Sequence, residues 1–189
     1  MKTLLLIFSC LLFGDSFSQQ QVIVYPAYTA YWNAKTLIPD SAVYVARPHK
    51  KVAPRLPNFH PTGSRINENI DYHGSGYDQG HLVNASDMNG NVTDEYNSFD
   101  QCNIFPQRPN LNRLTWLALE NRVRVLATTY GEVKVKISWH GVDGYMGKDK
   151  VIIPLYCDKE IWYNGKHEKY SMPNKDTVNQ HLYTYYLLK

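Results

Sequence analysis

A single stretch of the chain, residues 111–127, has the apolar spacing of a helix. Its apolar residues fall into one line with a second line beside it: Leu111, Leu114, Ala118 and Val125, then Leu119, Val123 and Leu126. Runs typical of strands precede it in residues 22–46 and follow it in VKVKISW, DKVIIPLY and EIWYNGKHEKYSM, the last with an Asn164-Gly165 hairpin turn. Strands around one main helix predict the α+β class, with a mixed β-sheet core.

Two shorter strands are expected before this helix. Residues 81–83 and 101–105 favour strands, and residues 84–100 form a polar excursion between them. Residues 106–110 then break the chain before the helix begins. Further upstream, residues 47–76 are rich in Pro, Gly, Asn, His and Arg, which predicts long irregular structure of a kind that is often functional.

The first twenty residues, MKTLLLIFSCLLFGDSFSQQ, have the pattern of a secretory signal peptide. One lysine precedes an apolar run of about a dozen residues, too short for a transmembrane span, and small residues at Ser16 and Ser18 suit a cleavage site. We expect residues 1–18 to be removed and the product to be secreted or periplasmic. A lipid on Cys10 is less favoured, because apolar residues continue beyond it. No later segment is long enough to span a membrane.

Composition supports one globular domain, residues 19–189, with a sizeable core. The chain is 43% hydrophobic and 20% charged, and its formal net charge is +3. This mild basicity permits a polyanionic partner without requiring one. Cys102 and Cys157 remain after cleavage, and outside the cell they could pair or stay free, because sequence cannot supply the Cα geometry.

The stretch YDQGHLVNASDM contains the first candidate for chemistry, His81. A lone histidine beside a glycine is usually structural or merely exposed. The six other histidines do not form the spacing of a zinc site with neighbouring Cys or Asp residues. Neither a serine-nucleophile motif nor a phosphate-cradling glycine loop is present. This stretch alone leaves His81 open as a catalyst, a metal ligand or a structural residue.

A second stretch, CNIFPQRPNLNRLTWLALENRVR, narrows the choice. It places Asn103, Asn112, Glu120 and Arg124 on a strand, a break and then the helix. At ~1.5 Å per residue, Asn112 and Glu120 lie about 12 Å apart along the helix, so Glu120 would more naturally hold a metal-bound water. Arg124 follows one turn later and could pair with Glu120 or reach a phosphate. A single amide ligand suits a hard cation such as Mg²⁺.

Together the two stretches resemble the DNA/RNA non-specific endonucleases, the ββα-metal or His-Me finger nucleases. Asp78-Gln79-Gly80-His81 resembles the D-R-G-H of that family, and residues 102–120 resemble its S-N-x-x-P-Q, L-N and W-x-x-L-E elements. DYHGSGY at residues 71–77 resembles D-Y-x-G-S-G-[FY], and two later patterns, V-x-[VI]-P and [IM]-P-N, recur at residues 151–154 and 172–174. The likeness covers nearly all of the chain after the signal peptide and implies a ββα-metal motif in the α+β fold.

The resemblance implies a role for each main candidate. His81 would be the general base, and an imidazole with an ordinary pKa near 6.5 suits that task. Asn112 would bind Mg²⁺, for which Mn²⁺ could substitute, and Glu120 would orient a water on the metal. Arg124 would lie near the scissile phosphate. Asn103 either supports His81 and the metal site or satisfies backbone groups at a strand end.

The remaining candidates concern substrate binding and motif support. Arg55 matches the upstream arginine of the family that contacts phosphate, with Arg65 as a competing match, and Arg113 is a further substrate-binding candidate. Gln79 replaces the family arginine, which keeps hydrogen bonding and loses a charge and a planar fork. Asp78 and Gly80 are expected to support the motif.

These inferences predict a secreted, Mg²⁺-dependent endonuclease that cleaves DNA and RNA to 5′-phosphate ends. Contacts mainly to phosphate would make binding sensitive to salt and indifferent to base sequence. One alternative is a catalytically weakened nucleic-acid-binding homologue, because of Gln79. Another is a nuclease toxin or effector. A homodimer and a protein inhibitor are left open as partners, and no membrane partner is expected.

Overall fold

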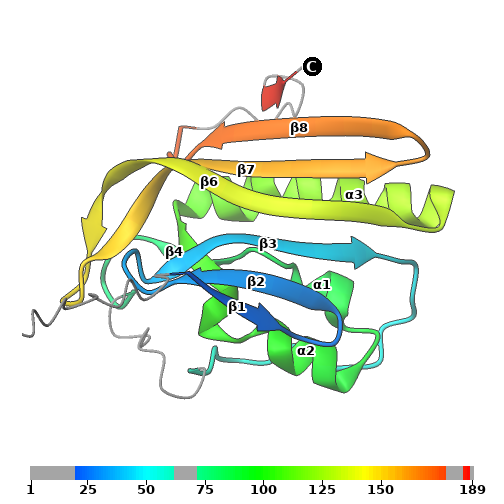
Figure 1. Cartoon of the computed structure of the whole chain (residues 1–189), viewed down its shortest axis with the longest axis horizontal. Coiled ribbons are helices and arrows are strands. Elements are labelled where there is room, and N and C mark those ends of the chain that lie inside the picture. The colour runs from blue at the N-terminus through cyan, green and yellow to red at the C-terminus, as the bar shows by residue number, and fades with distance from the viewer. Residues whose placement is uncertain (1–19, 62–71, 178–184, 188–189) are drawn as a thin grey trace, which may run out of the picture.

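The computed structural model describes residues 20–61, 72–177 and 185–187 (Figure 1). The expected signal peptide lies outside these ranges, as do Asp71 and Arg65. Among the described residues, no helix combines the length and the apolar composition needed to cross a membrane.

The centre of the described structure is a seven-stranded sheet in the order β1-β2-β3-β6-β7-β8-β9. Its strands are β1 (Gln20–Val24), β2 (Tyr28–Asn33), β3 (Ile38–Ala46), β6 (Val133–Met146), β7 (Val151–Tyr163), β8 (Lys166–Pro173) and β9 (Tyr186–Leu187). The α+β class is confirmed. Each neighbouring pair of these strands is antiparallel, so strand directions alternate across the sheet and the expected mixed sheet is an antiparallel one.

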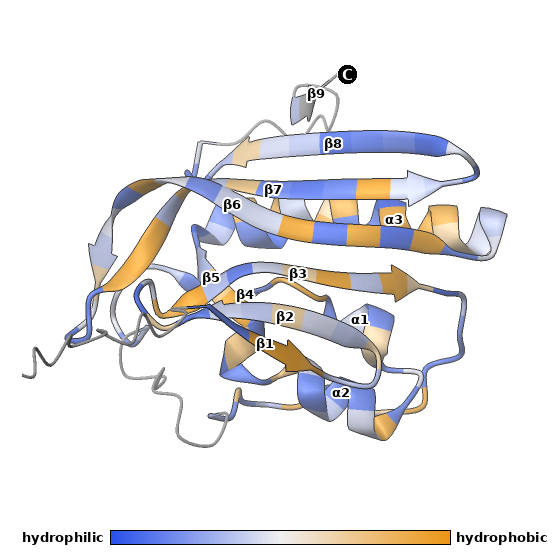
Figure 2. Cartoon of the chain, in the orientation of Figure 1, coloured by the Kyte–Doolittle hydropathy of each residue, from blue (hydrophilic) through white to orange (hydrophobic). Residues whose placement is uncertain are grey.

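Alternation of side chains explains why these segments form strands with one buried face. In β6, Val133, Val135 and Ile137 are buried while Lys134 is exposed, and Figure 2 shows the matching bands of hydropathy. DKVIIPLY and EIWY, expected as separate strands, form the single strand β7. Pro154, which lacks an amide hydrogen, is tolerated because it pairs with Val142 where the register shifts.

The turn between β7 and β8 has the predicted hairpin geometry. Asn164 and Gly165 both have positive φ, 44° and 70°. This pair of left-handed residues matches the twist of the flanking strands. The Asn-Gly prediction is therefore confirmed.

A second, two-stranded sheet carries the predicted histidine. It pairs β4 (Asp78–His81) with β5 (Ile104–Gln107), with His81 opposite Ile104. The boundaries differ from the prediction. The first strand ends at His81 instead of beginning there, residues 101–103 form a 3₁₀ turn, and Pro106 and Gln107 belong to the second strand.

The polar excursion between these strands folds into two short helices, α1 (Ala85–Met88) and α2 (Val92–Ser98). Asparagine side chains cap both. Asn84 Oδ1 accepts from the Ser86 amide at 2.6 Å, and Asn91 Oδ1 accepts from the Thr93 amide at 2.8 Å. Residues 84–100, predicted as a polar loop, thus contain two helices. The asparagines that made the segment polar are the residues that cap them.

The main helix begins with a π-helical segment, Leu111–Trp116, and continues as α3 (Leu117–Tyr130). The wider π turn brings Leu111 and Trp116, five residues apart, onto the buried side. The predicted apolar line is wrong in part, because Leu114 and Val125 are exposed and the second line carries the buried face. Gly131, with φ of 86°, ends the helix and donates its amide to the Ala127 carbonyl.

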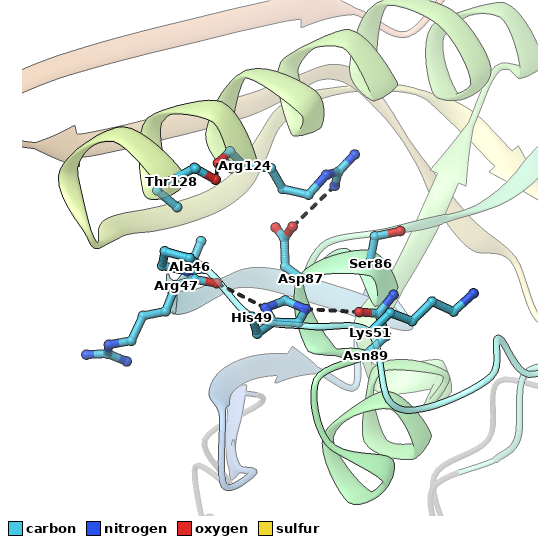
Figure 3. A pocket seen from close by; sticks show the side chains of 11 residues that line it. Ala46, Arg47, His49, Lys51, Ser86, Asp87, Asn89, Arg124 and Thr128 are labelled. Carbon is cyan, nitrogen blue, oxygen red and sulfur yellow. Dashed lines mark hydrogen bonds and ion pairs between the residues drawn. The ribbon is translucent and has the colours of Figure 1, made fainter.

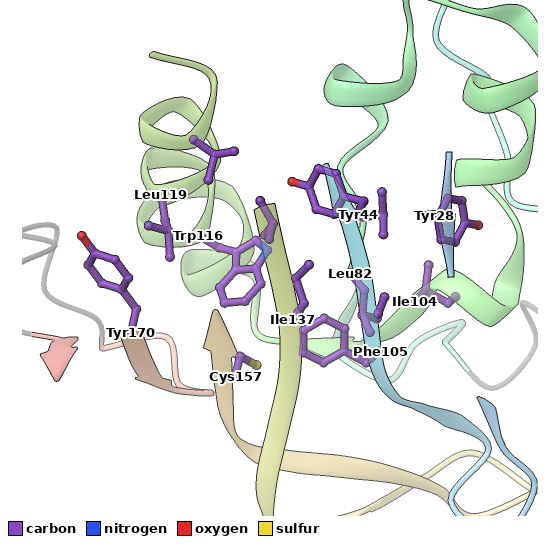
Figure 4. Close-up of a cluster of buried hydrophobic side chains, with 14 of the residues drawn as sticks. Tyr28, Tyr44, Leu82, Ile104, Phe105, Trp116, Leu119, Ile137, Cys157 and Tyr170 are labelled. Atoms are coloured by element: carbon purple, nitrogen blue, oxygen red, sulfur yellow. The ribbon is translucent and has the colours of Figure 1, made fainter. Parts of the chain in front are cut away.

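The core lies between the main sheet, the β4–β5 hairpin and α3 (Figure 4). Trp116 and Leu119 from the helix pack toward Ile137 and Cys157 of the sheet, with Phe105 of the hairpin beside them. Cys102 and Cys157 are both buried and do not form a disulfide, so the pairing left open by the sequence does not occur.

Candidate active site

A cavity of about 270 Å³ opens where β4, α1 and the start of the main helix meet. Five predicted site residues line it: Arg55, Gln79, His81, Asn112 and Glu120. Asn84, Ser86 and Leu117 complete the wall. Segments separated by up to 65 positions in the chain therefore present polar groups to one space.

The hairpin fixes the backbone of His81 from both sides. Gly80 packs against the buried Gln107, where an added Cβ would lie 2.0 Å from the Gln107 Oε1 atom, so only glycine fits without a shift. Asn103 donates its side-chain amide to the carbonyls of Val83 at 2.9 Å and Ser98 at 2.8 Å. It also accepts from the Val83 amide at 2.9 Å. Asn103 thus satisfies backbone groups just beyond His81 and does not line the cavity.

The His81 ring is held by two aromatic rings. The centres of the Phe59 and Phe99 rings lie 4.8 Å and 5.0 Å from its own. Its Nε2 atom is buried and has no hydrogen-bond partner among the described residues. Burial, and to a lesser degree the Arg55 guanidinium, lower the pKa of His81 to about 3. The imidazole is therefore neutral at pH 7, and burial makes it a weaker base than the ordinary imidazole expected from the sequence.

An amide and a carboxylate join the hairpin to the helix. The Asn112 amide nitrogen donates to Asp78 Oδ2 at 2.9 Å. Arg113 also donates to Asp78, with its Nε atom at 2.8 Å and its Nη2 atom at 2.6 Å. These contacts orient Asn112 so that its carbonyl oxygen is left for a cation. Arg113, predicted to bind substrate, is engaged with Asp78 and does not line the cavity.

Glu120 contributes a buried carboxyl group to the cavity. Burial raises its pKa to about 7, against the lowering effect of the Lys159 ammonium group. Lys159 belongs to β7, is fully buried, and places its Nζ atom 4.2 Å from the centre of the Trp116 ring. Burial lowers the pKa of Lys159.

Arg124 was expected either to pair with Glu120 or to reach a phosphate beside His81, and the structure places it elsewhere. Its Nη1 atom lies 3.2 Å from Asp87 Oδ1, and it also donates to Asn121. The other Asp87 oxygen accepts from the Tyr44 hydroxyl at 2.6 Å. Arg124 is thus paired with Asp87, not Glu120, and lines a neighbouring cavity in place of the one around His81.

The two remaining substrate candidates, Arg55 and Gln79, both line the cavity. Arg55 is exposed and holds its guanidinium 5.1 Å from the centre of the Phe99 ring. Gln79 occupies β4 opposite Pro106 and lines the cavity two residues before His81.

Sequence reasoning missed three polar residues of this region. Asn84 and Ser86 line the cavity and are the nearest polar residues after His81 in the chain. The burial of Lys159 could have been predicted from the sequence, because strand alternation places it on the same face as Cys157 and Ile161. A lysine at a core position of a strand indicates a buried cation.

The donors available for a metal are oxygens. Among the described residues, no three His, Cys, Asp or Glu side chains converge as a metal site. The Asn112 carbonyl and the Glu120 carboxylate nevertheless line one polar cavity. Such a donor set fits a hard divalent cation that keeps most of its waters.

A hairpin that carries a histidine, followed by a helix that carries an amide and a carboxylate, defines the ββα-metal nuclease fold. A crystal structure of the EndoG/EndoGI complex shares this fold, with a TM-score of 0.79 and 22% identity over 88% of this chain and 80% of that chain. The model of the DNA/RNA non-specific endonuclease family matches residues 9–187. The chain belongs to this family.

Curated relatives match over shorter stretches. A nuclease of Nostoc sp. is 33% identical over 116 residues, which are 58% of this chain and 40% of that protein. Mitochondrial endonuclease G is 40% identical in Bos taurus and 39% in Homo sapiens, in each case over 67 residues and 35% of this chain. Those stretches are 22% and 23% of the two proteins, so the chain matches less than half the length of each relative.

Proposed function

We propose that this chain is a metal-dependent endonuclease that hydrolyses the phosphodiester bonds of DNA and RNA with little sequence preference. One observation carries the proposal: His81, whose buried Nε2 atom has no hydrogen-bond partner among the described residues, lines one cavity with Asn112 and Glu120. Membership of the family and the names of its relatives support the same activity. The polar and charged side chains around His81 suit contacts to phosphate oxygens, which carry no sequence information.

In this mechanism His81 takes a proton from the attacking water. Phe59 and Phe99 hold the ring, and burial keeps it neutral, so the base is available without a prior deprotonation. Asn103 acts as a positioning residue, because its bonds to Val83 fix the backbone beyond the base. Attack on phosphorus with loss of the 3′ oxygen would leave a 5′-phosphate end.

Asn112 would hold the metal through its carbonyl oxygen, and Glu120 would reach it through water. Asp78 restrains the amide from behind. We propose Mg²⁺, with Mn²⁺ as a substitute. When bound, such an ion polarises the scissile phosphate and stabilises the departing oxygen.

Arg55 and Gln79 would bind the scissile phosphate from the rim of the cavity. Gln79 can donate a hydrogen bond but lacks the charge of the family arginine, so Arg55 would supply most of the attraction. The loss of that charge is the observation that favours a second candidate function, a homologue that binds nucleic acid and cleaves it weakly.

Export and assembly are further parts of the proposal. We propose that residues 1–18 are removed, that residues 19–189 form one nuclease domain, and that the product is secreted or periplasmic. Intact-mass analysis of the exported protein should give a chain that begins at Gln19.

The EndoG structure describes inhibition in a complex with EndoGI, and an inhibitor of similar role is a candidate partner here. A homodimer remains a prediction.

The direct test is degradation of plasmid DNA and total RNA by residues 19–189. We expect cleavage of both substrates in Mg²⁺, none in EDTA, and none by a folded His81→Ala variant. If the folded wild-type protein binds both substrates and leaves them intact in Mg²⁺ and in Mn²⁺, the catalytic proposal fails and the binding function replaces it.

A further inference from the structure

A second cavity of about 270 Å³ adjoins the His81 cavity. It lies between the chain after β3, the first helix α1 and the outer turns of α3, and its lining includes Lys51, Asp87 and Arg124 (Figure 3). Ser86 lines both cavities. A strand bound at His81 could therefore continue into this space without leaving the surface.

The charge of this cavity is positive. Lys51 is exposed and makes no ion pair with a described carboxylate. Among the described residues of the lining, Asp87 is the one acidic side chain, and its two oxygens already accept from Tyr44 and Arg124. Arg47 also lines the cavity, but its guanidinium pairs with Glu132 at 3.1 Å. Lys51 is thus the lining cation that has no ion pair with a described carboxylate. Arg124 uses part of its guanidinium on Asp87 and Asn121, and a guanidinium carries five N–H donors, so donors remain for a ligand.

The wall around Lys51 is held in place before any ligand arrives. The amides of Val52 and Ala53 both donate to the Asn89 carbonyl, at 2.8 Å and 2.9 Å, which ties the lysine loop to the end of α1. A loop anchored in this way loses little further freedom on binding.

His49 strengthens the same wall. Its Nδ1 atom lies 3.0 Å from the Arg47 carbonyl oxygen and its Nε2 atom 2.9 Å from Asn89 Oδ1 (Figure 3). The ring packs so closely on Gly90 that an added Cβ there would lie 2.7 Å from the imidazole. Both ring nitrogens are used within the protein, so His49 shapes the cavity and leaves ligand contact to the two cations.

We propose that this cavity binds a phosphodiester group of the substrate strand next to the scissile one, through Lys51 and Arg124. The inference rests on the proposed function, because it takes its ligand from the strand cut at His81. Apart from the His49 imidazole, no aromatic ring of the described chain lines the cavity. It therefore offers charge to a backbone phosphate and no stacking surface to a base, and contact here adds affinity without sequence preference.

The test measures binding separately from cleavage. In the His81→Ala protein, Lys51→Gln is compared with Lys148→Gln, a change of the same charge in the exposed turn after β6. The probe is a fluorescein-labelled single-stranded DNA, followed by anisotropy in EDTA at several salt concentrations. We expect Lys51→Gln to weaken binding and to reduce the slope of log Kd against log salt by about one, and Lys148→Gln to change neither.

Cleavage kinetics distinguish a specific phosphate site from general electrostatic attraction of the substrate. With His81 intact, Lys51→Gln should raise KM for an oligonucleotide while leaving kcat and the cleavage of a dinucleoside monophosphate, which has only the scissile phosphate, unchanged. A different result would overturn the strand assignment. If inorganic phosphate binds the wild-type protein and not Lys51→Gln, while Lys51→Gln leaves the KM for the oligonucleotide unaltered, the cavity is a site for free anions.

The outcomes distinguish the two proposals. If the wild-type protein cuts DNA and Lys51→Gln matches Lys148→Gln in Kd and slope, the phosphate site is wrong and the nuclease stands. If cleavage fails but the slope depends on Lys51, the phosphate site belongs to a binding protein. Absence of measurable DNA binding by the His81→Ala protein would also overturn the site.

Discussion

His81 and Glu120 share one cavity, yet burial moves their pKa values in opposite directions. The pKa of His81 falls to about 3 and that of Glu120 rises to about 7. Burial disfavours the charged form of each group, which is the protonated imidazole in one case and the carboxylate in the other. The group that titrates near neutral pH is therefore the glutamate and not the histidine.

The pH profile of the nuclease should report Glu120. We expect kcat/KM at limiting metal to fall as pH decreases through about 7, because the carboxylate is lost while His81 stays neutral. Saturating metal should move this limb to lower pH, since a cation favours the carboxylate. Initial rates of plasmid cleavage across pH 5–9 would measure both.

Two variants identify the group whose protonation causes the fall in kcat/KM below about pH 7. Glu120→Gln should lower the rate and remove the limb. Lys159→Met should move it to higher pH, because the buried ammonium favours the Glu120 carboxylate. A limb near pH 6.5 that persists in Glu120→Gln would return the ionisation to His81.

The sequence could identify His81 and Glu120 as site residues, but it could not predict their pKa values. Spacing and resemblance pointed to His81, Asn112 and Glu120, and the three do line one cavity. The shift of His81 depends on Phe59 and Phe99, which come from a loop and a helix end far apart in the chain. The pairing of Arg124 with Asp87 has the same origin, since α1 was not expected to exist.

At the scale of elements, the hairpin and the helix are joined through Asp78. It receives the Asn112 amide on the buried side and the Arg113 guanidinium on the exposed side. A contact that orients a metal ligand typically changes metal affinity or activity by 10–100-fold when removed. Asp78 is therefore expected to act through Asn112.

Asp78→Ala should raise the Mg²⁺ concentration for half-maximal cleavage by about 10–100-fold. Arg113→Ala is the matched control, because it removes the ion pair and keeps the Asp78–Asn112 bond. The Arg113 side chain is 68% exposed, so its own loss should have a small effect. Equal shifts in the two variants would show that the ion pair, and not the amide contact, sets metal affinity.

Element boundaries were less predictable than element types. The strands and the main helix follow from periods of two and of about 3.6 residues, which depend on local spacing. The π-helical segment, the two capped helices and the joining of two runs into β7 depend on tertiary contacts. The exposed Leu114 and Val125 show the consequence, because a periodic pattern read at constant pitch assigned them to the core.

For the whole molecule, the lack of a disulfide between Cys102 and Cys157 predicts a stability that does not depend on redox conditions. Cys102 and Cys157 are buried in the core, and burial raises the pKa of the Cys157 thiol, which keeps it protonated and slow to oxidise. We expect the same thermal unfolding midpoint with and without reductant. Alkylation of the denatured, unreduced protein should modify both thiols, and a single disulfide-linked species would contradict this.

The π-helical segment decides where a residue can be lost between Asn112 and Glu120. A wide turn holds about one residue more than an ordinary helical turn, so loss of one codon within Leu111–Trp116 is absorbed when that turn tightens, and Glu120 keeps its face. Loss of one codon between Leu117 and Glu120, where the helix is regular, instead rotates Glu120 by about 100° relative to Asn112 and out of the cavity. Reading-frame-preserving deletions should therefore be tolerated in the π-helical segment and selected against in residues 117–119.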